Sequence, residues 1–423
     1  MNSRERLKLA LDHKEPDRIP IDLGGSVVTG MHVTTVYLLR QALGLDRPDT
    51  PVKVIEPYQM LGEIKPDLIE ALGIDVIGLG KTKTFFGFKN QGWKPWTTFQ
   101  GTPVLVPEGF NTDPEPNGDI LMYPEGDESA PPSGRMPEGG WYFDAIVRQA
   151  PIVEKDLNVE DNLEEFGPIS EEELEHFRLE AARLHKETDK AIFASFGGMS
   201  FGDIAVIPAP HLKHPKGIRD VEEWYISTQI RRDYVWKVFE RQCEIALTNL
   251  EKVYRAVANQ VEVAFVTGTD FGMQRGPFIS PDTYRELYKP FHKRVNDWIH
   301  QNTEWKTFMH SCGSVRALIE DFITAGFDIL NPLQCSASQM DPSELKREFG
   351  DRISFWGGGV DTQHTLPFGT SDEVRREVSE RIRIFGPGGG FVFNAIHNIQ
   401  AKTPIENVLA MLETVRECGR YPL

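Results

Sequence analysis

The segment KTFMHSCGSVRALIEDFITAGFDILN, residues 306–331, decides the fold because it contains a strand, a helix and a second strand in succession. The run Lys306–His310 is apolar and rich in β-forming residues, and it ends on a polar residue. An amphipathic helical pattern follows over Ser314–Ala325, and the next apolar run covers Asp328–Asn331. Continuously apolar strands that alternate with helices are typical of a parallel sheet covered on both faces.

The same alternation recurs along the whole chain of 423 residues. Eight strands are expected, at Ile19–Asp22, Asp75–Leu79, Ala191–Ser195, Val261–Thr267, Lys306–His310, Asp328–Asn331, Ile353–Trp356 and Gly390–Asn394. A first helix is expected after an N-cap at Ser3, and further helical patterns lie at Pro66–Leu72, Glu171–His185, Tyr234–Ala258, Pro281–Gln301, Ser314–Ala325, Asp341–Phe349, Ser371–Phe385 and Pro404–Cys418. This pattern predicts an α/β fold, a (β/α)₈ TIM barrel. An open doubly wound sheet is the alternative, but no GxGxxG motif follows the first strand.

Residues 82–150 interrupt this alternation. They are rich in Gly, Pro, Trp and Phe and show no helical periodicity. We interpret them as a β-rich insertion after the second strand, placed over the mouth of a single barrel domain that spans residues 1–423. Two roles stay open: a surface hairpin, or a wall of a substrate pocket built from the aromatic residues Phe85, Phe86, Trp93 and Trp96.

Composition excludes several classes of protein. The 46 Lys+Arg and 63 Asp+Glu give a net charge of −17, which disfavours a nucleic-acid partner because an acidic chain repels phosphate. The N-terminal residues are charged throughout, and no apolar run approaches the roughly 20 residues that span a bilayer, so we expect neither a secretory signal nor a membrane segment. The 4 cysteines are too few for a disulfide framework, which favours reduced thiols and a cytoplasmic location.

Active sites of such barrels lie at the carboxyl ends of the strands, so the residues found there are the candidates. They are Asp22, Asp270, His310, Asn331, Trp356 and His397. Polar groups at so many strand ends favour an enzyme. Asp270 can be a general base, a metal ligand or a loop cap. His32 either faces the mouth or begins a helix, and Arg275 can bind an anionic group of a substrate.

His310 and Cys312 are two residues apart at a strand end, where both side chains can reach one metal ion. Zinc accepts this mixed set of nitrogen and sulfur ligands, and His397 can supply the third. Three protein ligands with one open position are typical of a catalytic zinc. Cys335 is a further candidate ligand, whereas Cys243 and Cys418 lie in helical patterns. The alternative is that Cys312 is only a small buried residue.

Four segments carry a family resemblance. They are RERLKLALDHKEPDRIPID at 4–22, FMHSCGSVRALIEDFITAGFDILNPLQ at 308–334, MDPSELKREFGDRISFWGGGVDTQ at 340–363 and GGGFVFNAIHNIQAKTPIENVLAMLETV at 388–415. In these segments the chain resembles the uroporphyrinogen decarboxylase superfamily and, within it, the branch of corrinoid-linked methyltransferases. The resemblance implies a (β/α)₈ barrel, which agrees with the strand pattern.

The resemblance also implies a zinc site made by His-x-Cys and a distant Cys. His310 and Cys312 match the first two positions, and His397 occupies the third, counting back from Thr403 and Pro404. An imidazole brings no charge where a thiolate brings one, so a zinc held by two His and one Cys is expected to be more Lewis acidic. Such a zinc is suited to activating an ether, alcohol or amine rather than to holding a nucleophilic thiolate.

Decarboxylases of the superfamily carry an Arg-rich N-terminal loop of the type RQAGRY that binds substrate carboxylates. This chain has DLGGSVVTGMHVTT at residues 22–35, without an arginine. A substrate with many carboxylates would therefore leave its charges unpaired there, which disfavours porphyrinogen decarboxylation.

The sequence therefore predicts a zinc-dependent methyltransferase that moves a methyl group from a small methylated substrate to the Co(I) centre of a separate corrinoid protein. The candidate catalytic residues are Asp270 and Asp22, and the candidate substrate-binding residues are His32, Phe85, Trp96, Arg275, Asn331 and Trp356. Two alternatives stay open: a zinc-free decarboxylase or lyase on the same barrel, and a binding protein without chemistry. A homodimer is compatible with an apolar-rich insertion.

Overall fold

The computed structural model describes residues 1–423. Its central element is a 7-stranded sheet in the order β14-β13-β12-β11-β10-β9-β3. All neighbouring strands pair in parallel. The strands are β3 (Val76–Leu79), β9 (Ala191–Ala194), β10 (Val263–Thr267), β11 (Lys306–His310), β12 (Ile329–Asn331), β13 (Ser354–Trp356) and β14 (Phe391–Val392). Seven of the eight strands predicted from the sequence are therefore present.

The expected first strand, Ile19–Asp22, is reduced to a single parallel bridge between Ile21 and Phe393. Pro20 has no N–H to donate, so this segment cannot form a full ladder. It nevertheless lies between β14 and β3. The amide of Asp22 donates to the carbonyl of Phe393 over 2.9 Å, and the amide of Asp75 donates to the carbonyl of Ile21 over 2.8 Å. The sheet with this segment forms a TIM-barrel-like α/β fold.

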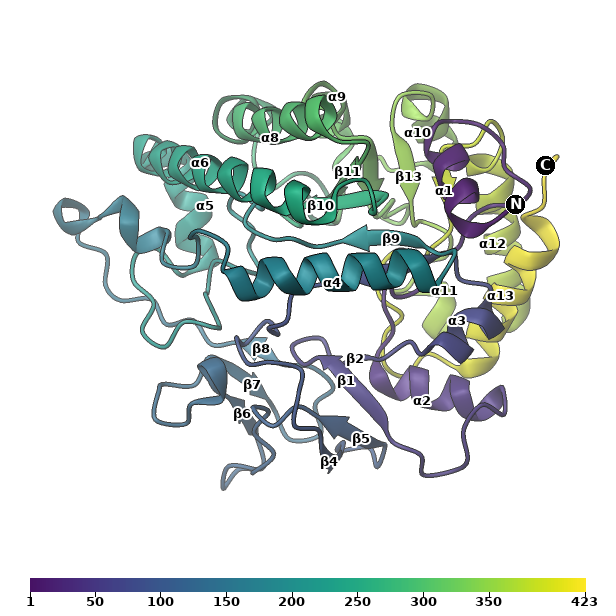
Figure 1. The fold of residues 1–423 in the computed structure, drawn as a ribbon, viewed down its shortest axis with the longest axis horizontal. Helices are drawn as coiled ribbons and strands as arrows, with labels where there is room; N and C mark the ends of the chain where they lie inside the picture. Colours follow the sequence, from purple (N-terminus) through teal and green to yellow (C-terminus); the bar gives the residue numbers. More distant parts are fainter.

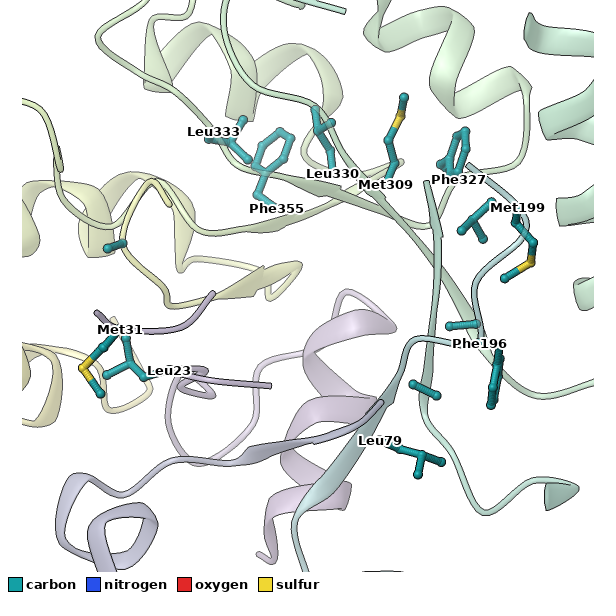
Figure 2. Packing of buried hydrophobic residues seen from close by; sticks show 14 of the residues in the cluster. Leu23, Met31, Leu79, Phe196, Met199, Met309, Phe327, Leu330, Leu333 and Phe355 are labelled. Carbon is teal, nitrogen blue, oxygen red and sulfur yellow. The ribbon is translucent and has the colours of Figure 1, made fainter. Parts of the chain in front are cut away.

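Side chains of alternate strand residues fill the interior of the curved sheet. Phe193, Phe308, Ile329 and Trp356 belong to an inner cluster of 11 buried residues. Helix α1 (Ser3–Leu11) adds Leu7 and Leu11, one turn apart, to the same cluster. The neighbouring strand residues Met309, Leu330 and Phe355 belong instead to the large cluster of 86 residues and lie toward the surrounding helices (Figure 2). Successive side chains of each strand thus point alternately into the barrel and toward the helices, as expected for a parallel sheet covered by helices.

Helices surround the sheet (Figure 1). They are α2 (Val33–Ala42), α3 (Pro66–Leu72), α4 (Glu171–Glu187), α5 (Val221–Ile230), α6 (Arg232–Val257), α7 (Pro281–Thr283), α8 (Lys289–Asn302), α9 (Arg316–Thr324), α10 (Pro342–Phe349), α11 (Thr365–Phe368), α12 (Ser371–Phe385) and α13 (Ile405–Cys418). The first helix is capped by Asn2, whose side chain accepts from the amide of Glu5, and not by Ser3 as expected.

The helix expected over Pro281–Gln301 is divided. A π-helical turn, η4 (Tyr284–Tyr288), separates α7 from α8. Pro290 follows this turn and lacks the N–H that a continuous α-helix would donate to the carbonyl of Glu286, which favours the wider turn at this point. Helices α2 and α5 were not expected from the sequence.

The β strands outside the barrel form a separate lobe, which Figure 1 shows below the barrel. Within residues 82–150 these are β4 (Lys94–Thr97), β5 (Pro103–Val106), β6 (Ile120–Met122), β7 (Gly134–Met136) and β8 (Asp144–Ala145). Strand β5 also pairs with β1 (Val52–Glu56), which pairs with β2 (Leu61–Gly62). The β lobe, residues 52–62 with 94–145, therefore includes an earlier part of the chain that the sequence did not suggest.

Asp75, which immediately precedes β3, is fully buried and anchors the opposite end of the sheet. It accepts from Arg6 Nη1 over 2.6 Å, Arg18 Nη1 over 2.7 Å and Ser3 Oγ over 2.9 Å. Two arginines and a hydroxyl satisfy this buried carboxylate, so this end of the sheet has a structural function. No helix of the chain is both long enough and apolar enough to cross a membrane.

Candidate metal centre

His310, Cys312 and His397 lie together at the carboxyl end of the sheet. Their potential ligand atoms all lie within 4.8 Å of one another. Cys312 Sγ is 3.3 Å from His310 Nε2, and the two imidazole rings lie with their centroids 5.0 Å apart at an angle of 78°. Two nitrogens and one sulfur around a common point fit the tetrahedral preference of zinc, with the fourth position free for a substrate.

His310 is the last residue of β11, and Asn331, the last residue of β12, fixes its ring. The amide nitrogen Nδ2 of Asn331 donates to the carbonyl of Trp356 over 2.8 Å. The other side-chain atom of Asn331, Oδ1, must therefore accept the hydrogen of His310 Nδ1, over 2.6 Å. This contact places the lone pair of His310 on Nε2, the atom that faces Cys312.

Burial keeps both imidazoles neutral. It lowers the pKa of His310 and lowers the pKa of His397 to about 3, so each ring offers a lone pair rather than a second proton at neutral pH. Neutral imidazole is the form that binds a metal.

Asp270 holds the turn that carries Cys312. Its Oδ1 accepts from the amide of Cys312 over 2.6 Å and lies 3.8 Å from His310 Nε2. Burial, with the negative charge of Asp270 second, raises the pKa of Cys312 well above its usual value. The thiol alone therefore stays protonated, whereas a bound cation would favour the thiolate.

A cavity of about 1490 Å³ opens beside these groups, between the carboxyl end of the barrel and the β lobe. His310, His397 and Asp270 line it, and Phe85 lines it from the segment that follows β3. Four residues named from the sequence therefore face one space. Phe85 packs against Tyr58 with ring centroids 4.7 Å apart, which gives the cavity an aromatic wall.

Three other sequence candidates are buried behind this cavity instead of lining it. Trp356 is fully buried in the inner cluster, and its indole N–H donates to Asp22 Oδ2 over 2.9 Å. Asp22 is itself fully buried, which raises its pKa to about 6. Asn331 acts on His310 rather than on the cavity. Strand-end position alone does not distinguish a side chain that faces the mouth from one that packs below it.

The remaining substrate-binding candidates also lie elsewhere. His32 begins α2, where its Nδ1 accepts from the amide of Thr34 over 3.2 Å, and it lines a separate cavity of about 180 Å³. Trp96 packs on Phe110 within the β lobe, with ring centroids 5.2 Å apart. Arg275 is exposed on the loop after β10 and does not line the large cavity.

All four cysteines are free thiols. Cys335 lies outside the group of potential ligands, and its Sγ faces the carbonyl of Leu333 at 3.4 Å. Burial raises the pKa of Cys335 to about 12, and this half-buried thiol packs against the large core cluster. Phe86 is buried in the large core cluster, and Trp93 stacks under the ammonium of Lys53 at 4.9 Å.

Asp203 is a cavity residue that the sequence did not suggest. It is 8% exposed, and its Oδ1 accepts from the amide of Ala205 over 3.0 Å. Burial, with the nearby charge of Asp270, raises the pKa of Asp203 to about 7. The residue lies well beyond the end of β9, in a loop that returns to the mouth, so no strand-end rule could identify it.

The family comparison agrees with the fold and the site. A family model described as uroporphyrinogen decarboxylase (URO-D) matches residues 231–418, which contain all three potential metal ligands. A solved methyltransferase from Methanosarcina mazei has a similar fold, with a TM-score of 0.53 over 99% of each chain at 17% identity. The resemblance to the uroporphyrinogen decarboxylase superfamily is therefore confirmed.

The curated relatives include a methyltransferase and several decarboxylases. A methylcobamide:CoM methyltransferase of Methanosarcina barkeri is 26% identical over 138 residues, 32% of this chain and 36% of that protein. A uroporphyrinogen decarboxylase of Thioalkalivibrio sulfidiphilus is 24% identical over 151 residues, 34% of this chain and 40% of that protein. A uroporphyrinogen decarboxylase of Thermus thermophilus is 22% identical over 284 residues, 64% of this chain and 73% of that protein. The chain thus spans well under half of the length of the first two relatives.

Proposed function

We propose that the protein is a zinc-dependent methyltransferase that moves a methyl group from a small methylated substrate, such as an ether, to a corrinoid carried by a partner protein. The observation that carries this proposal is the grouping of His310, Cys312 and His397 beside a large cavity. The methyltransferase relative and the methyltransferase of similar fold support it at low identity.

The residues present fit a zinc ion chemically. Zinc bound by His310, Cys312 and His397 would draw electron density from the methylated heteroatom and make it a better leaving group. Asn331 orients His310, and Asp270 holds the amide of Cys312, so both act as positioning residues. Their contacts fix the ligands before a substrate arrives.

Asp203 can supply the proton that the demethylated heteroatom needs. Its raised pKa, about 7, keeps a large fraction of the carboxyl protonated near neutral pH. It lines the same cavity as Asp270, which has one oxygen engaged by the amide of Cys312. We therefore propose Asp203 as the proton donor, and Asp270 as the group that keeps Cys312 in place.

The dimensions of the cavity suit two reactants. Sites for single small ligands commonly occupy about 300–1,000 Å³, and this cavity of about 1490 Å³ is larger. The aromatic pair of Phe85 and Tyr58 can cover the apolar part of a substrate, and the remaining space can admit a corrinoid presented by a partner.

The zinc-free decarboxylase is the second candidate, because a decarboxylase relative matches 64% of the chain. The loop that precedes α2 argues against it. Leu23, Gly24, Gly25, Ser26, Val27, Val28 and Gly30 line the cavity, and residues 22–35 contain no arginine or lysine that could pair with substrate carboxylates.

A methyl-transfer assay with free cob(I)alamin as acceptor separates the two candidates. A panel of small methyl ethers is incubated with the protein, and methylcobalamin is followed by its visible spectrum. We expect transfer with one or more ethers, loss of transfer after chelation and recovery on adding Zn²⁺. Full transfer by chelated protein would refute the role of zinc, and release of CO₂ from carboxylated substrates without cobalamin would favour the decarboxylase.

A further inference from the structure

Three basic side chains line the cavity beside β3, and we call them the cationic pocket: Lys81, Lys83 and His211. Lys81 and Lys83 follow the carboxyl end of β3 directly, and His211 comes from the long loop between β9 and α5. Lys83 has one carboxylate nearby, Glu125 at 3.5 Å, and both of these side chains are about half exposed. Lys81 is exposed and has no ion-pair or hydrogen-bond partner within the chain, so its ammonium is free to bind an anion.

The Lys81 ammonium lies against Gly197. A Cβ at Gly197 would lie 2.4 Å from Lys81 Nζ, so only glycine allows the ammonium to lie there. Gly197 and Gly198 have φ of +79° and +80°, which a side chain would oppose. Lys81 thus extends over the loop that follows β9, which also lines the cavity.

His211 adds a neutral hydrogen-bond donor. Burial, followed by the charge of Lys81, lowers the pKa of His211 to about 4, so its ring carries one N–H at neutral pH. Its ring makes no hydrogen bond within the chain. The charges of Arg219, Lys83 and Arg148 lower the pKa of His211 in the same direction.

The strand order places the cationic pocket away from the metal ligands. Strands β9 and β10 lie between β3, which precedes Lys81, and β11, which ends in His310. Asp203 and Asp270 come from the loops that follow these two intervening strands. One cavity thus has a cationic wall, an acidic wall and the potential metal ligands around its circumference.

We propose that the cationic pocket binds a carboxylate of the methylated substrate, so that the natural substrates are methylated acids. This inference rests on the proposed function and narrows it from small methylated compounds to anionic ones. A carboxylate would accept from the Lys81 ammonium and from the His211 N–H, and both donors otherwise lack an acceptor within the chain. The chain has a net charge of −17, so this local group of basic side chains stands out as a place where an anion can bind.

Direct binding of acid–amide pairs tests the proposal. The probes are 4-methoxybenzoate with 4-methoxybenzamide, and methoxyacetate with methoxyacetamide, titrated calorimetrically into the full chain. The members of each pair differ in charge and hardly in shape. We expect at least one acid to bind about tenfold or more tightly than its amide, the range of a charge-assisted hydrogen bond. In Lys81→Met this preference should disappear while amide affinity stays constant.

Lys213→Met is the matched control, because Lys213 is a nearby lysine that pairs with Asp127 at 2.6 Å and does not line the cavity. It should keep the preference for acids. Equal binding of acid and amide, absence of saturable binding by both acids, or a preference that survives in Lys81→Met would overturn the proposal.

The titrations are repeated on chelated protein, so that carboxylate binding by the cationic pocket is measured independently of zinc-dependent methyl transfer. If untreated, zinc-supplemented protein prefers acids but transfers no methyl group, the cationic pocket is retained and only methyl transfer is refuted. Methyl transfer from neutral ethers with no preference for acids would retain the proposed function and refute the pocket.

Discussion

His310 donates its Nδ1 hydrogen to Asn331 Oδ1 over 2.6 Å, and this contact links the ends of two neighbouring strands, β11 and β12. Asn331 is in turn held by the carbonyl of Trp356 in β13. Three adjacent strands therefore determine which nitrogen of His310 faces Cys312. A ligand held in this way loses little conformational freedom when it binds a metal ion.

The first prediction concerns Asn331. Asn331→Ala should weaken zinc binding by about 10- to 100-fold, because the ring of His310 loses the acceptor that orients it. Asn331→Asp keeps the acceptor for His310 but loses the N–H that donates to the carbonyl of Trp356, so its zinc affinity should lie between those of Asn331→Ala and wild type. Competition with a chromophoric chelator measures both variants, and equal zinc affinity in wild type and Asn331→Ala would contradict the orienting role.

The second prediction concerns the pH dependence of stability. The pKa of Asp203 is raised from 3.8 to about 7, so the folded protein retains a proton that the unfolded chain releases above about pH 4. Stability is consequently lost as pH rises from about 4 to about 7. Asp203→Asn removes this loss and should be more stable than wild type above pH 7, by on the order of 2–4 kcal/mol.

Denaturant unfolding at about pH 5 and about pH 8 checks this prediction. The advantage of Asp203→Asn should be larger at the higher pH. Asp351→Asn, at a side chain that is 84% exposed, serves as the control and should show no such trend. An Asp203→Asn variant with the same stability difference at both pH values would show that Asp203 is not protonated in the folded protein.

The third prediction separates Trp356 from substrate binding. Trp356→Phe removes the indole N–H that donates to the buried Asp22 carboxylate. The variant should lose about 1–3 kcal/mol of stability because Asp22 loses a hydrogen-bond donor. Its affinity for substrates or probe ligands should be unchanged, since the side chain does not line the cavity. If Trp356→Phe bound ligands more weakly and kept the stability of wild type, this prediction would be wrong.

Much of the fold could be predicted from the sequence because its signal is periodic. Seven strands lie where the apolar runs predicted them, and α3 and α12 have the expected bounds. The remaining segment, Ile19–Asp22, contains Pro20, and its pairing depends on Phe393 far along the chain. The β lobe was only partly expected, because the pairing of β1 with β5 joins segments with no shared local pattern.

The candidate site was only partly predictable. The expectation that active-site residues lie at the carboxyl ends of the strands identified His310, His397 and Asp270, which line one cavity. Cys312, predicted as a metal ligand with His310, lies beside them. The same expectation also identified Trp356 and Asp22, which point into the barrel, because sequence position does not give the direction of a side chain. Asp203 and His211 depend on how the long loop between β9 and α5 returns to the mouth, and no local pattern encodes that return. Lys81 directly follows β3, so its position at a strand end could have identified it.

Zinc content is the most direct test of the central claim that His310, Cys312 and His397 form one metal site. Elemental analysis is done on wild type, Cys312→Ala, His397→Ala and the control Cys335→Ala, all purified without chelators. We predict one zinc per chain in wild type and in Cys335→Ala, and its loss in the other two variants. Wild type without zinc, or zinc retained in both Cys312→Ala and His397→Ala, would contradict the account.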